Sequence, residues 1–378
     1  MASLTNLKIV LLFGNLELGG AERQGLLLAR HLKEQQGAEV QVWGLGAGRG
    51  AVADQCEVWN IPWRAVTLHW GLRRRLPHLL RLWWRLRDLQ PQIVLSYTKV
   101  PNLAAALLWR WCGVRLCVWN QADAGLLLPS TWLHRWAISR VRQFIANAEG
   151  GRQYLLETFG LAPSQVRLIR NGVCQAAPAD DRPTWRQRLS VSDDAVVVVM
   201  VANLSRYKDH ATLLRAWRLL LSSRGDCNDL LVLAGRFDDQ AEALQQQAER
   251  LGVAGQVRFL GAVSDVSGLL AAADLCVHSS PSEGIPNAVL EAMASGLPVI
   301  GSDIPGLREA VGEAGLSLLA PVGDAEALAA LLQRLMQDSD ERQRQGALMR
   351  QRAEQQFGLE RMCCETVDYL QAALEGMP

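Results

Sequence analysis

Two carboxylates lie close to the start of a predicted helix in residues 280–300, SPSEGIPNAVLEAMASGLPVI. Glu283 lies in a turn rich in proline and glycine, and Glu291 follows Asn287 by about one helical turn. Free N–H groups and the dipole at a helix N-terminus favour an anion such as a phosphate. Because a carboxylate is a poor phosphate ligand, we expect the two glutamates to bind hydroxyl groups. The pattern therefore predicts a site for a sugar nucleotide.

The elements around these residues form a strand, a loop, a helix and a second strand. Residues 273–279 predict a buried strand, and the apolar residues of 287–294 recur at helical spacing. Pro286 suits the first turn of the helix, and Gly296 suits its end. The glutamates would then lie at the carboxyl end of a strand, where open α/β sheets bind their ligands.

A second corner of the same kind follows the apolar run 195–201, which predicts a buried parallel strand. The sequence NLSRYKDH, residues 203–210, joins this strand to a predicted helix over 211–221. Arg206 and Lys208 in this corner could clamp a diphosphate. The alternative is an ordinary basic turn exposed to solvent.

Two glycine-rich stretches lie near the N-terminus. Gly19 and Gly20 separate a predicted strand, 9–13, from a predicted helix and would let the backbone approach a ligand closely. A plain strand-to-helix turn is the alternative. The glycines of 44–50 do not have the GxGxxG spacing of dinucleotide-binding proteins, and no clear amphipathic helix is predicted after them, so we expect a flexible loop.

Residues 280–300 resemble the nucleotide-sugar signature of family 4 glycosyltransferases, E-G-x-P-N-x-x-x-E-A-M-A-x-G-x-P-V-I, at nearly every position. An ordinary loop-helix corner remains the alternative. The resemblance implies that Glu283 holds the hydroxyls of the transferred sugar and that Glu291 holds the ribose. The donor-binding residues that it implies in this segment are Glu283, Gly284, Ile285, Pro286, Asn287 and Glu291.

Other segments resemble further motifs of the family. Residues 208–210 match the end of V-G-R-L-x-x-x-K-G/D-H, but Asn203 stands where the family has arginine. We infer that Arg206 replaces it, so the expected catalytic residues are Glu283, Lys208 and Arg206. The donor would also contact Asn203, Arg206 and Lys208 in this corner. Further donor contacts are Gly19 and Gly20, which match a G-G-x-E stretch over the donor phosphates, and Arg236, which follows a strand at the usual place of the nucleobase.

The resemblance implies transfer of a sugar from a nucleotide diphosphate sugar, taken as a UDP-sugar, to an acceptor hydroxyl with retention of configuration. Tyr97 and Asn120 are the candidates on the acceptor side, at strand ends where relatives often have histidine. Neither is a good base, which fits a reaction in which the leaving phosphate takes the proton. We expect no metal and no cofactor besides the nucleotide sugar. No metal-spaced carboxylate cluster is evident, and residues 238–239 are interpreted as loop.

Strand-helix alternation along the 378 residues predicts parallel sheets in two domains. The resemblance implies the GT-B fold, an α/β architecture of two Rossmann-like domains facing an interdomain cleft. We predict an acceptor domain over 1–172 and a donor domain over 173–360. A helix over 361–378 would return to the first domain. The 49% apolar and 20% charged residues are typical of a soluble protein.

Several features concern localisation. No run approaches the ~20 apolar residues of a membrane helix, and the apolar core near the N-terminus is too short for a signal peptide. Eight scattered cysteines lack metal spacing and suit reduced thiols. We therefore expect a cytoplasmic protein.

Charge is uneven along the chain. Residues 1–172 contain 21 Lys+Arg and 10 Asp+Glu, a net of +11, whereas the remainder contains 18 and 28, a net of −10. Arginines and tryptophans concentrate over 63–87, a combination that suits an anionic membrane surface. The alternative is that these tryptophans pack in the core and the arginines are merely solvated. With a membrane, the acceptor would be lipid-linked, as in synthesis of a cell-surface polysaccharide or glycolipid, and the enzyme would be peripheral on the inner face. No nucleic-acid partner is expected.

Other classes of protein share these features. A nucleotide-sugar epimerase or a phosphorylase can use the same fold, and analysis of products would separate them. A non-catalytic sugar-nucleotide-binding protein is also possible, because Asn203 departs from the family's arginine.

Overall fold

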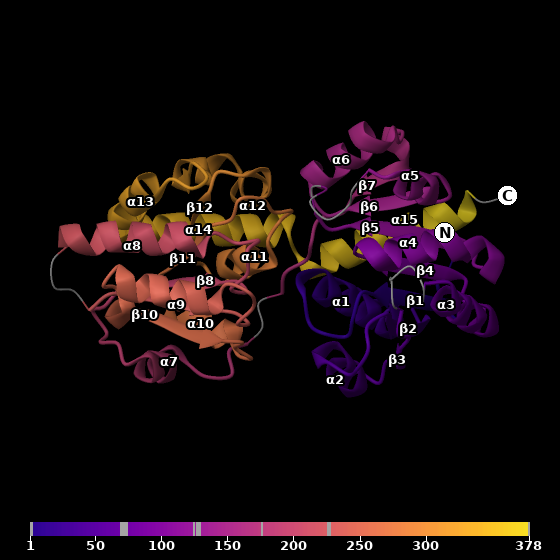
Figure 1. Cartoon of the computed structure of the whole chain (residues 1–378), viewed down its shortest axis with the longest axis horizontal. Helices are drawn as coiled ribbons and strands as arrows, with labels where there is room; N and C mark the ends of the chain where they lie inside the picture. Colours follow the sequence, from indigo (N-terminus) through magenta and orange to yellow (C-terminus); the bar gives the residue numbers. More distant parts are fainter. Residues whose placement is uncertain are drawn as a thin grey trace. The chain divides into compact units, whose positions relative to one another are not determined.

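The computed structural model describes residues 3–68, 75–123, 125, 130–174, 177–224 and 228–376. The chain forms two compact units, Met1–Gly172 with Leu359–Pro378, and Val173–Gly358. The last helix, α15 (Leu359–Glu375), belongs to the first unit and begins two residues before the predicted start at 361. Each unit is a parallel sheet with helices on it (Figure 1).

The first unit contains a sheet of seven parallel strands in the order β3-β2-β1-β4-β5-β6-β7. Its strands are β1 (Lys8–Phe13), β2 (Glu39–Gly44), β3 (Trp63–Ala65), β4 (Ile93–Tyr97), β5 (Leu116–Gln121), β6 (Gln143–Ala146) and β7 (Val166–Leu168). The central strands are almost wholly buried, because helices cover both faces of a parallel sheet.

Helices of the first unit form two layers. They are α1 (Gly20–Glu34), α2 (Ala51–Val58), α3 (Arg75–Leu89), α4 (Lys99–Leu108), the 3₁₀ turn η1 (Trp109–Cys112), α5 (Trp132–Ser139), α6 (Glu149–Phe159) and the 3₁₀ turn η2 (Pro163–Gln165). One apolar cluster joins the sheet to α1, α2 and α15. A second joins its other face to α3, α4, α5 and α6.

The second unit contains six parallel strands in the order β10-β9-β8-β11-β12-β13. They are β8 (Val197–Val201), β9 (Leu230–Ala234), β10 (Val257–Gly261), β11 (Leu275–His278), β12 (Val299–Ser302) and β13 (Leu319–Ala320). The chain leaves β8 toward β9 on one side and later adds β11 on the other. The carboxyl ends of β8, β9 and β11 are therefore neighbours at one edge of the sheet.

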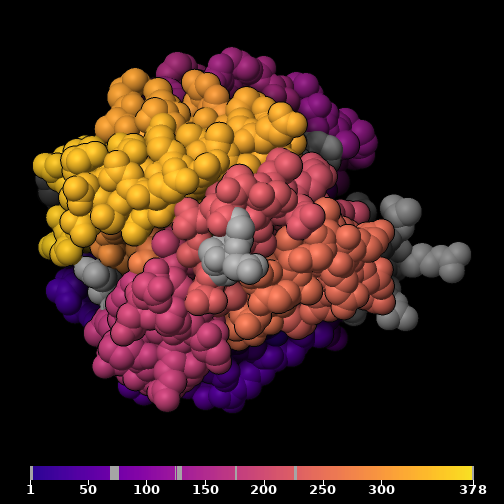
Figure 2. Space-filling view, turned by 90° about the vertical axis from the view of Figure 1, so that its left-hand side faces the viewer, coloured from indigo at the N-terminus to yellow at the C-terminus, as the bar shows by residue number. Residues whose placement is uncertain are grey.

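The helices of the second unit are α7 (Arg182–Leu189), α8 (His210–Arg224), α9 (Ala241–Arg250), α10 (Val266–Ala272), α11 (Asn287–Ala294), α12 (Pro305–Gly315), α13 (Ala325–Gln337) and α14 (Ser339–Gln356), with 3₁₀ turns η3 (Ala254–Gln256) and η4 (Leu316–Leu318). Helix α13 packs against both α8 and α14. Figure 2 shows the surface that these helices form, with α14 in yellow and α8 in salmon.

Some elements differ from the sequence prediction. Helix α2 follows the glycine stretch directly, where no helix was predicted. Its apolar residues do not mark one face, since Ala51 and Val58 are exposed. Val52 donates its N–H to the Leu16 carbonyl, which fixes the start of the helix. Strand β3 and helices α5 and α12 were not predicted either. Each depends on packing against the sheet rather than on a strong local pattern.

Two remaining predictions concern membranes. Among the described residues, no helix has the length and apolar character needed to cross a bilayer. Trp70, Arg73 and Arg74, from the predicted basic stretch, lie outside the described residues. Trp63 and Trp83 are half-buried; Trp63 packs against the first apolar cluster and Trp83 against the second. This agrees, for these two side chains, with the alternative that the tryptophans pack in the core.

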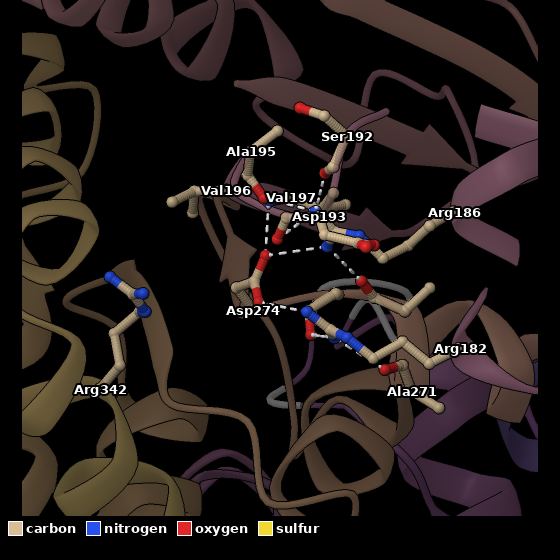
Figure 3. A network of polar contacts seen from close by, with 12 residues as sticks. Arg182, Arg186, Ser192, Asp193, Ala195, Val196, Val197, Ala271, Asp274 and Arg342 are labelled. Carbon is tan, nitrogen blue, oxygen red and sulfur yellow. Dashed lines mark hydrogen bonds and ion pairs between the residues drawn. The ribbon is translucent and has the colours of Figure 1, made fainter. Parts of the chain in front are cut away.

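A buried arginine ties α7 to the sheet of the second unit (Figure 3). Arg186 is 3% exposed and lies 3.4 Å from the carboxylate of Asp274. Its guanidinium also donates to the carbonyls of Ser192, at 2.5 Å, and Ala195, at 2.6 Å. Asp274 in turn accepts from the N–H of Val197, the first residue of β8, at 2.7 Å. The network therefore holds the first residue of β8 in place.

Removing the Arg186 charge should destabilise the second unit. Arg186→Met keeps much of the side-chain volume but leaves the Ser192 and Ala195 carbonyls without their arginine donor. Asp274 keeps only Arg182 of its two cations, so we expect a loss of about 2–4 kcal/mol. Arg188→Met is the matched control on the same helix, because Arg188 is 52% exposed and its pair with Asp180 lies at the surface; we expect a loss below about 1 kcal/mol. Urea unfolding of both variants measures this, and equal losses would contradict the structural role.

Candidate functional site

Two strand-to-helix corners of the second unit are bonded to each other. Residues 203–210 follow β8, and residues 279–286 follow its neighbour β11. Asp209 donates its N–H to the Ser279 carbonyl at 3.0 Å, and the Ser279 hydroxyl donates to the Asp209 carbonyl at 2.7 Å. The Ser280 hydroxyl also reaches the carbonyl of Tyr207, at 3.1 Å. These bonds fix the separation of the two corners and of the side chains they carry.

The predicted residues Lys208 and Glu283 meet between these corners. The Lys208 ammonium forms an ion pair with Glu283 Oε1. The same oxygen is approached by the Ser280 hydroxyl at 3.1 Å and by His278 Nε2 at 3.4 Å. The structure thus brings together two of the three expected catalytic residues and adds His278 and Ser280 beside them.

Neighbouring side chains keep the carboxyl group of Glu283 ionised. Burial alone would raise the pKa of this carboxyl, but the hydrogen bond from His278 and the positive charge of Lys208 outweigh it and lower the pKa to about 2. Burial is also the main reason why the pKa of His278 is lowered, so the imidazole is neutral. Since the folded pKa of Glu283 is depressed, its stabilising contribution is present near neutral pH and is lost only as pH falls toward about 2. Glu283 is therefore suited to accept hydrogen bonds rather than to act as a general acid.

A second histidine lies beside the pair. His210, the first residue of α8, is 1% exposed, and burial, with further effects from His278 and Lys208, lowers its pKa to about 4. The unfolded chain therefore takes up a proton near the ordinary histidine pKa, whereas the folded chain does not until about pH 4. Acidification through this window removes stability from the second unit.

An open hollow of about 620 Å³ adjoins the corner after β8. Its lining comprises Asn203, Ser205, Arg206, Tyr207, Lys208, Arg236, Asp238 and Asp239. Four predicted donor-binding residues, Asn203, Arg206, Lys208 and Arg236, therefore share one hollow. Its size lies within the range of sites for small molecules and cofactors.

Asn203 and Arg206 have different surroundings. The Asn203 side chain accepts a hydrogen bond from the N–H of Arg236 at 3.1 Å, so it joins the corner after β8 to the end of β9. The exposed Arg206 guanidinium lies over the Tyr207 ring, 5.2 Å from its centroid, and donates to the Tyr207 hydroxyl at 3.1 Å. Arg206 is thus placed beside Tyr207 and not in the Lys208–Glu283 pair.

The loop before α11 is closely packed. Gly284, Ile285 and Pro286 are buried, while Asn287 and Glu291 are half-buried on the first turns of the helix. Both Asn287 and Glu291 have polar interactions within the protein. The predicted helix start at Asn287 is confirmed, with Pro286 as the residue that precedes it.

Two glycines allow backbone segments to approach at this edge. A Cβ at Gly306, in α12, would lie 1.6 Å from the Gly284 carbonyl oxygen. A Cβ at Gly235, at the end of β9, would lie 2.1 Å from the Ala202 carbonyl oxygen. Both distances are far below van der Waals contact, so a side chain at either position would displace the corners. These glycines position the site through the backbone.

The remaining predicted residues lie in the first unit. Gly19 precedes α1 with extended backbone, and a Cβ there would lie 2.5 Å from Glu22 Oε2; Gly20 is the first residue of the helix. Tyr97 ends β4, and Asn120 lies on β5 beside it in register. Their positions within this unit are at the carboxyl edge of its sheet, as the prediction required.

Tyr97 and Asn120 line a small cavity at that edge. Further polar side chains around it include Gln24, Gln121 and Asn147. Asn120 is 8% exposed and donates its amide to the Ser96 carbonyl at 3.0 Å. Burial raises the pKa of Tyr97, so its hydroxyl stays protonated. The cavity is lined by apolar and uncharged polar residues.

Sequence reasoning missed His278, Ser280 and Gly306. His278 ends strand β11 and Ser280 follows in the loop, and their contact with Glu283 depends on how that loop turns back. Gly306 lies outside the matched signature, and its importance becomes clear only from the close approach to residue 284. Within the described parts of the chain, no group of three His, Cys, Asp or Glu side chains could hold a metal ion.

Family models match both halves of the chain. The model described as Glycosyltransferase Family 4 matches residues 18–175, and that described as Glycosyl transferases group 1 matches residues 181–352. A D-inositol 3-phosphate glycosyltransferase of Streptomyces scabiei is 29% identical over 242 residues, which are 61% of this chain and 54% of that relative. The chain thus spans about half the length of the curated relatives it matches first.

Solved structures share the fold over nearly the whole chain. Anabaena HepE, in complex with UDP and glucose, has a TM-score of 0.84 at 22% identity and covers 97% of this chain and 100% of its own. Sucrose-phosphate synthase from Thermosynechococcus elongatus has a TM-score of 0.81 at 19% identity, with 98% and 100% covered. The predicted GT-B fold is confirmed by these likenesses. With its two units matched by successive family models over residues 18–352, the chain belongs to the family 4 glycosyltransferases.

Proposed function

We propose that this chain transfers a sugar from a UDP-sugar to an acceptor hydroxyl with retention of configuration. The observation that carries the proposal is the Lys208–Glu283 ion pair, held between two strand-to-helix corners of the second unit. Glu283 is an ionised carboxylate that can accept hydrogen bonds from sugar hydroxyls. Lys208 is a cation that can pair with a phosphate of the donor. Glu291 lies about one turn into helix α11 and would bind the ribose.

Departure of the nucleoside diphosphate places negative charge on its phosphates in the transition state. Lys208, Arg206 and the N-terminus of α11 are the groups that would neutralise it. Arg206 would leave the Tyr207 ring, an exposed contact that costs little to break. The nucleobase would lie near Arg236, which shares the hollow with Asn203 and Lys208. In this proposal the chain's own cations serve the leaving group, without a metal or another cofactor.

The acceptor would bind at the cavity around Tyr97 and Asn120 in the first unit. Its uncharged amide and hydroxyl groups suit an acceptor presenting hydroxyls. Because burial keeps Tyr97 protonated, the proton of the acceptor hydroxyl would pass to the leaving phosphate rather than to a protein base. Gly19 and Gly20, at the start of α1, would contribute backbone N–H groups to the donor phosphates.

The cellular setting follows from the acceptor. We propose a cytoplasmic enzyme, peripheral on the inner face of the membrane, that acts on a lipid-linked acceptor in polysaccharide or glycolipid synthesis. The net charge of +11 over residues 1–172 supports this setting. A non-catalytic sugar-nucleotide-binding protein is the second candidate, since Asn203 replaces the family's arginine and is engaged in a structural bond to Arg236.

The two glutamates should give different defects. Glu283→Gln keeps the shape but removes the charge and frees Lys208, so we expect turnover to fall by about 10²–10³-fold while UDP alone binds at least as tightly. Glu291→Ala should mainly weaken donor binding, by about 1–3 kcal/mol. Steady-state kinetics and titration with UDP measure both effects. Wild-type turnover in both variants would refute the assignment of this site.

The Lys208 charge should matter most in the transition state. Lys208→Ala should lower kcat by roughly 100-fold or more, because the diphosphate gains charge as the bond to the sugar breaks. Arg250→Ala is the control, since Arg250 is an exposed cation on α9. Thermal unfolding of each variant shows whether the fold survives without the ion pair. Equal kcat values in the two folded variants would contradict the proposed clamp.

Donor hydrolysis tests the proposed function as a whole. A thermal-shift panel of UDP-, GDP- and ADP-sugars identifies the donor, and hydrolysis of that donor with and without EDTA follows. We expect stabilisation by a UDP-sugar and slow hydrolysis that persists in EDTA, because Lys208 and Arg206 supply the positive charge. Stabilisation without any hydrolysis or transfer would favour the non-catalytic candidate, and a strict divalent-metal requirement would overturn the metal-free mechanism.

A further inference from the structure

All four exposed tryptophans among the described residues lie on three elements of the first unit. Trp84 on α3 is 62% exposed, Trp111 on η1 is 55% exposed, and Trp132 and Trp136 on α5 are 78% and 44% exposed. Exposure of so many large apolar rings on one part of a protein marks an interaction surface. We call the exposed face formed by residues 76–89, 109–115 and 131–142 the tryptophan–arginine surface.

The three elements are held against one another, so their exposed tryptophans lie on one part of the first unit. Trp83 Nε1 and Arg87 on α3 both donate to the Trp111 carbonyl, at 3.2 and 3.4 Å. Arg140, just after α5, lies over the rings of both Trp111 and Trp136, 5.0 and 5.1 Å from their centroids. Segments far apart in the sequence therefore meet here.

Apolar and basic side chains alternate on this surface. Leu76 and Leu80 on α3 are 67% and 54% exposed and are spaced one turn apart in line with Trp84. Over residues 76–89, 109–115 and 131–142 the only acidic residue is Asp88. The arginines of these ranges are Arg81, Arg85, Arg87, Arg110, Arg115, Arg135, Arg140 and Arg142. In the described parts of the chain, none of them forms an ion pair with a carboxylate.

Three of these arginines surround a hollow next to the tryptophans. Arg110, Arg115 and Arg142 line a hollow of about 460 Å³ at the amino ends of β5 and β6, bordered also by the end of α15. Guanidinium groups bind phosphates through paired N–H donors, so three of them around one hollow suit phosphate groups. Strand β5 begins at this hollow and ends at the cavity with Asn120, so the two lie at opposite edges of the sheet.

We propose that the tryptophan–arginine surface binds the face of an anionic phospholipid bilayer, with the tryptophans at headgroup depth and the arginines on lipid phosphates. Indole rings and arginine side chains both suit the boundary between headgroups and acyl chains. A second copy of the chain fits poorly, because a two-fold contact would oppose the same eight arginines. Exposed Leu76 and Leu80 favour lipid over a nucleic acid. The proposal does not depend on the transferase reaction.

Vesicle co-sedimentation of the full chain tests the proposal. The vesicles contain phosphatidylcholine alone or mixed with phosphatidylglycerol, at low and high salt. The double change Arg115→Glu and Arg142→Glu reverses charge at the hollow, so binding to anionic vesicles should fall at least about tenfold. Trp84→Ser with Trp132→Ser removes exposed rings, and it should weaken the binding that remains at high salt.

Matched controls lie on the second unit. Arg218→Glu with Arg250→Glu makes the same charge change at exposed positions of α8 and α9. Leu219→Ser with Leu348→Ser removes exposed apolar side chains, 44% and 46% exposed. Both controls should bind anionic vesicles like the wild-type chain. Thermal unfolding of every variant confirms that it is folded, and hydrolysis of a soluble donor, if found, should be unchanged in all of them.

The outcomes separate this proposal from others. Binding to anionic vesicles that is weaker at high salt and in the Arg115/Arg142 variant, with the remainder reduced in the Trp84/Trp132 variant, supports it. Binding that ignores lipid charge, or that the controls lose equally, overturns it. If the chain does not bind vesicles but the surface variants abolish a dimer in analytical ultracentrifugation or binding to RNA, the surface serves a different partner and the membrane proposal is wrong.

Discussion

The second unit depends on keeping one carboxylate ionised where it is largely removed from water. Burial acts against the charge of Glu283, and only close partners can offset this penalty. Lys208 supplies the opposite charge, and Ser280 and His278 supply hydrogen bonds to the same oxygen. Because Lys208 comes from a different loop, the ion pair forms only if both loops hold their separation. The hydrogen bonds between Asp209 and Ser279, one from a backbone N–H and one from the Ser279 hydroxyl, meet this requirement.

Parallel topology is what places the two loops side by side. Strand β8 lies between β9 and β11, so the corners that follow these three strands meet at one edge where the strand order reverses. Close approach at that edge then excludes side chains at Gly235 and Gly306. The Arg186 network fixes the opposite end of β8 through Asp274 and Val197. The site is thus positioned from both ends of the same strand.

The sequence predicted the parts of this arrangement that have strong local patterns. The apolar runs and the signature over 280–300 predicted the strands, the helix start at Asn287 and the two-unit fold. Helix α2 was missed because its apolar residues do not mark one face, with Ala51 and Val58 exposed. The role of His278 was missed because its contact depends on a loop turning back, and the position of Arg206 depends on the adjacent Tyr207 ring. The tryptophan–arginine surface draws on three separate segments, so a single stretch, 63–87, could reveal only part of it.

In the proposed reaction Lys208 would have two competing partners, Glu283 and the donor diphosphate. In the unliganded chain its charge compensates Glu283, and a donor diphosphate beside it would compete for the same ammonium. Glu283 would then need other hydrogen-bond donors, which the hydroxyls of the transferred sugar can provide. A nucleoside diphosphate alone brings the competing charge without those hydroxyls, so it leaves Glu283 poorly compensated. The ion pair therefore favours the intact donor over the released product, which would help the product to leave once the sugar has been transferred.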